Sequence, residues 1–193
     1  MSRRSTVHLL RHGPTSATRR SLFAADEPLD AKGRDLVADW CGRLEADRAA
    51  SSPLRRCLET AELAGHADPV VDGRWSELDF GQWKGLSLAR AAELYPDDMS
   101  RWLEDPFGVS PPGGETFAQL KERVESAMRD LAATGETTLV VTSAGPIKAA
   151  VLSVLEAPST SLWRIDPMPG SVTTFTAHDG IWSLRALSKE PVR

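Results

Sequence analysis

The stretch TTLVVTSAGPIKAAVLSVL, residues 137–155, constrains the fold of this chain more than any other. Its apolar run from Leu139 to Val141 does not alternate with polar residues, which is the pattern of a strand covered on both faces. A tight turn then leads directly into an apolar helix. Such a strand–turn–helix unit is typical of a parallel sheet with helices on both sides. The stretch therefore predicts an α/β fold.

The remaining elements are expected to alternate in the same way. Short strands are expected at 6–10, 49–51 and 69–71, and helices at 30–45, 52–65, 87–104 (broken near Pro96) and from Thr116 onward. Ser52 is expected to cap the second of these helices. Two final strands, at 171–177 and 181–187, flank a His178-Asp179-Gly180 hairpin turn. This order predicts a single domain over residues 1–193, a three-layer sandwich with a mostly parallel central sheet and helices on both faces.

Bulk properties exclude several classes of partner. The net charge of −4 gives no overall attraction to nucleic acid or to an anionic membrane. No apolar run approaches the roughly 20 residues that a membrane-spanning helix needs. Cys41 and Cys57 do not have the spacing of a metal motif, and they are interpreted as free, buried thiols in a reducing compartment. We therefore expect a cytoplasmic protein without a nucleic-acid or membrane partner.

Three of the expected strands are followed by residues that suit an anion. Arg11 and His12 follow the first strand, and Arg55 lies in the first turn of the helix after the second. Ser143 and Ala144 follow a third strand and begin a helix whose free N–H groups attract anions. Because ligands of open α/β sheets collect at the carboxyl ends of the strands, we expect these residues to meet.

The residue types indicate phosphoryl chemistry at this edge of the sheet. The planar fork of an arginine binds phosphate oxygens in pairs, and an imidazole such as that of His12 can form a covalent intermediate. A leaving alkoxide needs a proton from a nearby carboxylic acid. Glu77, in the loop after the strand at 69–71, is the best-placed acid, with Asp79 as a competing candidate.

Five motifs then resemble those of one protein family, in the family's order. They are LLRHGPT, SSPLRRCLETA, ELDFGQWKG, PPGGET and VVTSAGPIKAAV, and together they span residue 7 to about residue 154. This succession resembles the histidine phosphatase superfamily, whose fold is also called phosphoglycerate-mutase-like. The stretch ELDFGQWKG, followed by W…DP…GGE, looks most like the α-ribazole phosphatase branch.

The resemblance implies a role for each of four residues. His12 would be the phosphorylated nucleophile, and Glu77 would donate a proton to the leaving group. Arg11 and Arg55 would hold the phosphoryl oxygens. No metal or cofactor is implied, and the expected partner is a small phosphorylated molecule.

The substrate side of the pocket departs from the family pattern. We expect Thr15, Thr18, Ser143 and Ala144 to line it, but the family has a second histidine where Ser143 stands and an asparagine where Thr18 stands. A serine donates one hydrogen bond and carries no charge. Losing one preorganised donor at such a centre typically costs roughly 10²–10³ in rate.

Two functional hypotheses follow. The first is a phosphomonoester hydrolase that acts through a phosphohistidine at His12 on a small metabolite, weakened or altered by Ser143. The alternative is a non-catalytic phospho-ligand-binding protein, or a repurposed biosynthetic member of the same fold. Retention of both His12 and Glu77 weighs against pure binding, which needs neither. A homodimer is left open, as is the choice between a lid and a contact surface for the Pro/Gly-rich loop at 106–114.

Overall fold

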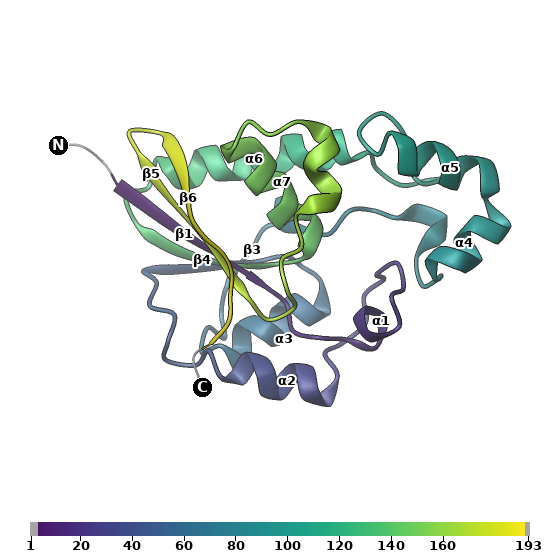
Figure 1. Ribbon diagram of the computed structural model, residues 1–193. Coiled ribbons are helices and arrows are strands. Elements are labelled where there is room, and N and C mark those ends of the chain that lie inside the picture. The colour runs from purple at the N-terminus through teal and green to yellow at the C-terminus, as the bar shows by residue number, and fades with distance from the viewer. Residues whose placement is uncertain (1–3, 192–193) are drawn as a thin grey trace.

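The computed structural model describes residues 4–191, which form a three-layer α/β sandwich around a six-stranded sheet (Figure 1). Its strands are β1 (Arg4–Arg11), β2 (Arg48–Ser51), β3 (Val70–Val71), β4 (Thr137–Thr142), β5 (Val172–His178) and β6 (Ile181–Lys189). The spatial order is β3-β2-β4-β1-β5-β6. The first four strands in this order run parallel, whereas β5 and β6 are antiparallel to their neighbours. The predicted fold class is confirmed.

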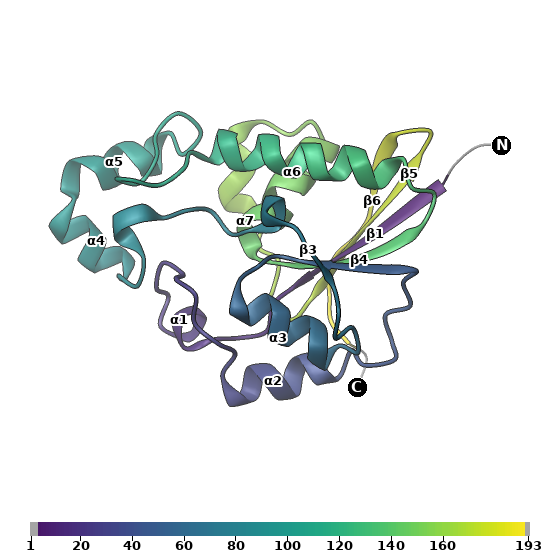
Figure 2. The ribbon, with the colours of Figure 1, turned by 180° about the vertical axis from the view of Figure 1, so that it is seen from behind.

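Helices cover both faces of the sheet, as Figures 1 and 2 show. The covering helices are α2 (Ala31–Ala38) and α3 (Arg55–Leu63) on one face and α6 (Phe117–Ala132) and α7 (Ala144–Val154) on the other. Alternate residues of β4 serve the two layers. Val140 packs in the core with α6 and α7, whereas Leu139 and Val141 pack in a second core that includes Cys57 of α3. The run without alternation is therefore buried on both sides, as predicted.

A helical arm extends beyond the carboxyl ends of the parallel strands (Figure 1). It comprises α4 (Leu88–Leu94) and α5 (Pro96–Glu104), and α1 (Ser16–Arg19) lies near it. The predicted break near Pro96 is confirmed, since Pro96 is the first residue of α5. The rings of Phe23, Phe80 and Trp83 meet Trp102 of α5 and join the arm to the core. Single helical turns occur at η1 (Gly73–Trp75), η2 (Gly81–Trp83) and η3 (Ser159–Arg164).

Two predicted helix bounds were wrong. The helix expected at 30–45 ends at Ala38, and the chain continues in turns that carry Trp40 into the core, where its indole N–H donates to Gly170 O at 2.7 Å. The helix expected from Ser52 begins at Arg55 instead. Its start is delayed because the Ser52 backbone still extends the sheet, donating to the main-chain oxygen of Val141 at 2.9 Å.

The predicted C-terminal hairpin is confirmed. Asp179 and Gly180 form its two-residue turn, with φ angles of 48° and 84°. Positive φ at both central residues matches the right-handed twist of the paired strands. No helix within residues 4–191 is long and apolar enough to cross a membrane.

Candidate active site

The ends of β1 and β4 bring the two main candidate segments together. Arg11 pairs with Thr142 in the parallel register, and the next backbone N–H, that of His12, donates to Thr142 O at 2.9 Å. His12 and Ser143 therefore lie at the same edge of the sheet, immediately beyond two adjacent strands. The β1 and β4 segments meet as predicted.

The ring of His12 is oriented for attack through its Nε2 atom. Its Nδ1 lies 2.7 Å from the main-chain oxygen of Gly13, which can only accept, so Nδ1 carries the proton. Nε2 of the neutral ring then keeps its lone pair. The side chain is buried, with 3% of the residue exposed. Burial lowers the pKa of His12 well below its ordinary value, and the neighbouring charges of Arg56 and Arg11 lower it further. The ring is therefore neutral at neutral pH, with the lone pair on Nε2.

This environment predicts the titration of His12. Because the folded pKa lies well below the ordinary value of 6.5, we expect the ring to remain the neutral Nδ1–H tautomer at that pH and to take up a proton only in more acidic solution. The unfolded chain takes up this proton near pH 6.5, so His12 costs stability as the pH falls below that value. NMR of the histidine ring nitrogens, assigned with His12→Ala, measures the midpoint. A midpoint at or above 6.5 would contradict the buried, doubly cationic environment.

Arg56, and not Arg55, is the arginine of α3 that reaches the site. The prediction that Arg55 lies there was wrong. Arg55 points to solvent, with 62% of its side chain exposed, and pairs with Glu59 at 2.9 Å. Arg56 is fully buried and donates through Nη2 to Ser143 Oγ at 3.5 Å. The reason is helical phase, since consecutive residues of a helix point about 100° apart and only one of the two can face the sheet edge.

Arg56 and Arg11 together form a cationic pocket around His12. Arg56 Nη1 donates to Ala25 O at 2.7 Å, and Arg11 Nη1 donates to Pro167 O at 2.6 Å. The Nε–H of each guanidinium is buried and has no partner within residues 4–191. Burial lowers the pKa of Arg11, as does the charge of Arg56. Two nearby guanidinium groups with unused N–H donors form a site that can bind an oxyanion such as a phosphoryl group.

Glu77 is fixed beside the start of α7. Thr142 Oγ1 donates to the main-chain oxygen of Trp75 at 2.6 Å, which ties the Glu77 loop to the end of β4. The Glu77 carboxylate accepts from the backbone N–H groups of Leu78 at 2.8 Å and Gly145 at 3.1 Å, both through Oε1. Oε1 holds the shorter bonds, and Oε2 accepts a longer one from Gly145 at 3.4 Å.

Ser143 lies at the centre of the cluster. It is fully buried, and it is the N-cap residue of α7 but makes no side-chain capping bond. Its hydroxyl instead meets Arg56 Nη2 at 3.5 Å and Cys57 Sγ at 4.0 Å. Burial raises the pKa of the Cys57 thiol to about 11, so the thiol is neutral. Ser143 is therefore placed to donate a hydrogen bond into the pocket, and Ala144 follows it as the first residue of α7.

Thr15 and Thr18 support the pocket indirectly. The two residues form a capping box at the start of α1, which occupies the Thr18 hydroxyl with Thr15 O at 2.9 Å. Thr15 Oγ1 also donates to Glu27 Oε1 at 3.1 Å, and that oxygen lies 3.8 Å from Arg56 Nη1. Glu27, which the sequence reasoning missed, is thus the carboxylate partner of the buried arginine.

A cleft of about 390 Å³, here called the main cleft, opens over Arg56 and Glu77. Asp79, the competing acid, also lines it but pairs with Lys84 at 2.7 Å, with half of its side chain exposed. Glu77 alone of the two contacts the start of α7, which favours Glu77 as the acid. No group of histidine, cysteine or acidic residues suited to a metal ion occurs in the described part of the chain.

The Pro/Gly-rich loop at 106–114 contributes a wall of the main cleft. Gly113 and Gly114 line the cleft, and the next backbone N–H, that of Glu115, donates to Asp79 O at 3.0 Å. A Cβ atom on Gly114 would lie 2.1 Å from the same oxygen, so only glycine permits this approach. The end of the loop is therefore bound to the segment that carries the acid.

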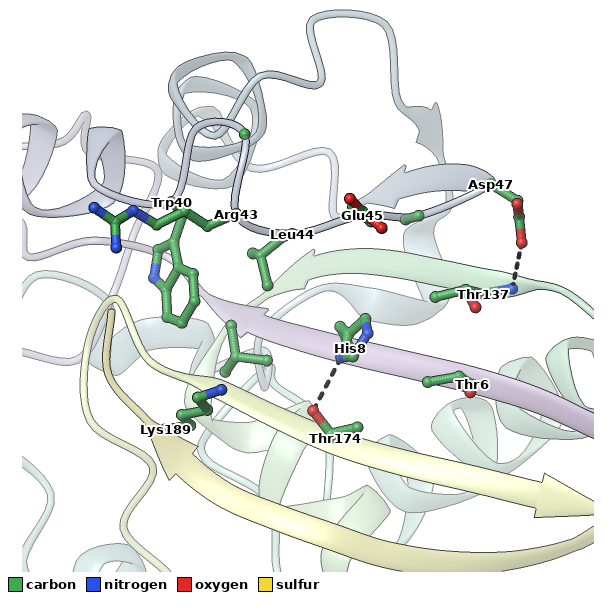
Figure 3. Close-up of a pocket in the computed structure, with 13 residues that line it drawn as sticks. Thr6, His8, Trp40, Arg43, Leu44, Glu45, Asp47, Thr137, Thr174 and Lys189 are labelled. Carbon is green, nitrogen blue, oxygen red and sulfur yellow. Dashed lines mark hydrogen bonds between the residues drawn. The ribbon is translucent and has the colours of Figure 1, made fainter. Parts of the chain in front are cut away.

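A larger cavity, of about 600 Å³, lies apart from these residues (Figure 3). Its walls come from β1, β5 and the segment at 40–47, and His8 Nδ1 meets Thr174 Oγ1 there at 2.9 Å. Burial lowers the pKa of His8, and the charge of Lys189 lowers it further. None of the candidate site residues lines this cavity, so it is separate from the His12 site.

Known proteins resemble this chain in sequence and in fold. The model of the histidine phosphatase superfamily (branch 1) matches residues 7–190. The bifunctional protein Rv2228c of Mycobacterium tuberculosis is 38% identical over 195 residues, covering 94% of this chain and 53% of the relative. The chain thus spans about half the length of that relative.

Two further proteins complete the comparison. Phosphoserine phosphatase 1 of Hydrogenobacter thermophilus is 31% identical over 147 residues, covering 72% of this chain and 69% of the relative. The crystal structure of a putative alpha-ribazole-5′-P phosphatase from Escherichia coli K-12 superposes with a TM-score of 0.87 at 22% identity, covering 98% of this chain and 99% of the other. At that identity the second likeness concerns the fold alone.

Proposed function

Because this chain belongs to the histidine phosphatase superfamily (branch 1), we propose that it is a phosphomonoesterase that acts through a phosphohistidine at His12. One observation carries the proposal. The buried, neutral His12 keeps the lone pair of Nε2 and lies near two arginines, each of which has a buried Nε–H without a partner in the described chain. A pocket built only to bind an anion needs no nucleophile of this kind.

In the first half of the reaction, Arg11 and Arg56 hold the phosphoryl oxygens of a monoester in front of His12. Nε2 attacks phosphorus, and the bond between phosphorus and the ester oxygen breaks. Glu77 gives its proton to the leaving oxygen, so the alcohol departs neutral. The Ser143 hydroxyl donates a hydrogen bond to a phosphoryl oxygen but adds no positive charge.

In the second half, water attacks the phosphorus of the phosphohistidine. Glu77, now a carboxylate, accepts a proton from that water, and the bond between phosphorus and Nε2 breaks. Inorganic phosphate leaves, and both His12 and Glu77 return to their starting states. The cycle therefore needs only a phosphomonoester and water.

The substrate proposed is a small phosphorylated metabolite. The main cleft supports this size, and the name of the phosphoserine phosphatase relative supports the substrate class. The likeness to an α-ribazole phosphatase is a likeness of fold and gives no substrate here. Cys41 and Cys57 are both free, which supports a reducing compartment such as the cytoplasm. Only Cys57 is buried as predicted, since Cys41 is exposed.

Ser143 is proposed to be the position that limits the rate. Ser143→His is expected to raise kcat for an aryl phosphate about 10²-fold, because the negative charge of the bound phosphoryl group would keep an imidazole at this position protonated, and the imidazolium would offset charge that develops during transfer. Steady-state kinetics of the wild type and the variant measure the effect. Ser143→Gln is the matched control, since it adds similar bulk without a charge. A folded Ser143→His protein no faster than Ser143→Gln would show that Ser143 is not limiting.

Steady-state hydrolysis of an aryl phosphate and a panel of sugar, nucleoside and amino-acid phosphates tests the function itself. We expect the wild type to release phosphate from at least one of these monoesters. A wild type and a Ser143→His variant that both bind phosphate but hydrolyse none of them would favour the non-catalytic alternative.

A further inference from the structure

A second and smaller cavity adjoins Glu77. Its volume is about 120 Å³, and we call it the side pocket. Its wall is mostly apolar and includes the rings of Phe80, Trp102 and Trp163, and Lys148 supplies a cation. Pockets for whole drug-sized ligands start at roughly 300 Å³, so the side pocket has room for part of a molecule only. Since Glu77 lines both this pocket and the main cleft, the two meet at the acid.

Lys148 has no ion-pair partner in the described part of the chain. Its ammonium lies 5.8 Å from the centre of the Trp163 ring, within cation–π distance, but it makes no hydrogen bond or ion pair within residues 4–191. Burial lowers the pKa of Lys148 and the charge of Arg11 lowers it further, while the carboxylates of Asp166 and Glu77 oppose the shift. Lysines normally extend their charge into water, so a half-buried ammonium without an ion-pair partner indicates an anion-binding position.

The position of Lys148 on α7 places its ammonium in the same pocket as Glu77. Lys148 lies four residues after Ala144, so both occupy the same face of the helix. Ala144, the backbone of Gly145 and the carboxylate of Glu77 all line the side pocket with it. An anion bound by Lys148 would therefore lie beside Glu77, in a pocket that Arg56 does not line.

The main cleft offers no equivalent cation. Lys84 there is paired with Asp79 at 2.7 Å, and Arg123 is paired with Glu115. Arg56, the remaining cation of that cleft, belongs to the phosphoryl pocket. Lys148 is thus the cation beside Glu77 that is left for another part of the substrate.

We propose that the side pocket binds the alcohol part of the substrate, with an apolar or aromatic body against Phe80 and Trp163 and a carboxylate on Lys148. The inference rests on the proposed function, because it takes Glu77 as the group that protonates the leaving oxygen. One ammonium balances the single charge of a carboxylate, whereas a second phosphate would bring close to two charges. The aromatic wall suits an apolar body through ring stacking.

Binding of phosphonates, which cannot be hydrolysed, tests the pocket without turnover. Isothermal titration calorimetry compares phenylphosphonate with its meta- and para-carboxy derivatives, in the wild type, Lys148→Met and Lys84→Met. We expect the wild type to bind one carboxy derivative about 10-fold more tightly than the parent, as a charge-assisted hydrogen bond would give. Lys148→Met should lose the preference. Lys84→Met, which removes a cation that is already paired, should keep it.

The outcomes separate this inference from the proposed function. Equal binding of all three phosphonates by the wild type, or a preference that survives in Lys148→Met, would overturn the side pocket as a carboxylate site. Hydrolysis of phenyl phosphate by the same wild type would then leave the phosphatase proposal standing. A Lys148-dependent preference in a protein that hydrolyses no monoester would support the pocket and contradict the phosphatase.

Discussion

His12→Ala is expected to lower kcat for aryl phosphate hydrolysis at least about 10³-fold, because it removes the atom to which the phosphoryl group is transferred. The two arginines and Glu77 remain, but water would have to attack the bound ester directly. The ring is nearly enclosed, with 3% of the residue exposed, so its loss leaves a small cavity and costs some stability as well. Steady-state rates with thermal unfolding as the check on folding measure both effects.

The comparison for His12→Ala is best made twice, in the wild type and in the Ser143→His background, so that a slow wild type does not hide the loss. His8→Ala is the control, because that histidine lies in the separate cavity of β1 and β5. Its rate should stay within about a factor of two of the wild type. A folded His12→Ala protein that keeps a tenth or more of the activity would show that phosphoryl transfer does not pass through this residue.

The second large expected effect on activity distinguishes Arg56 from the adjacent Arg55. Arg56→Ala is expected to lower kcat/KM by roughly 10²–10³, because it removes a guanidinium preorganised against the phosphoryl oxygens. Arg55→Ala should leave kcat/KM within about a factor of two, since its side chain is 62% exposed and pairs only with Glu59 at 2.9 Å. The two variants remove the same group from neighbouring positions, so each is the control for the other.

Arg56→Lys refines that comparison. It keeps a positive charge but loses the planar fork, so a partial recovery of kcat/KM would report charge and the remaining deficit would report geometry. Unfolding measurements are needed for both Arg56 variants, because Arg56→Ala leaves the half-buried Glu27 without its cation and Arg56→Lys changes the geometry of that pair. If Arg55→Ala were the damaging change and Arg56→Ala the silent one, the phase of α3 described above would be wrong.

Much of the fold could be predicted from local pattern. The apolar run at 139–141 fixed a strand buried on both faces, and the structure divides it between two cores. The hairpin at Asp179-Gly180 follows from turn chemistry alone. Helix ends were less predictable, because Ser52 remains bonded to Val141 of the neighbouring strand, a long-range contact that local sequence does not contain.

The site was predictable in its types of residue and less so in its positions. Two consecutive arginines carry the same chemistry, and choosing between them requires the phase of the helix. The buried face of α3 carries Arg56 together with Cys57, Thr60 and Ala61, and Arg55 lies outside it. The apolar members Cys57 and Ala61 lie at similar helical angles from both arginines, so apolar periodicity alone did not distinguish them. Thr15 was expected at the substrate, but its hydroxyl is engaged with Glu27 at 3.1 Å.

Two other features depend on contacts far apart in the sequence. Glu27 reaches Arg56 from a loop with no strand or helix pattern of its own, so no periodicity marks it. Lys148 stands in an apolar helix, where sequence alone favours a lysine that extends into solvent. Its enclosure comes from Trp163 of η3, fifteen residues later, and from the Glu77 loop. Tertiary packing therefore determines what both residues face.

Trapping of the phosphoenzyme tests directly whether the phosphoryl group is transferred to His12. The wild type is mixed with an aryl phosphate, quenched in alkali within one turnover and digested for mass spectrometry, because phosphohistidine survives alkali and is lost in acid. We expect a transient phosphoryl group on His12 that forms no more slowly than the alcohol is released. This group should be absent from His12→Ala. Turnover without a phosphoenzyme, or a phosphoryl group on a different residue, would contradict this expectation.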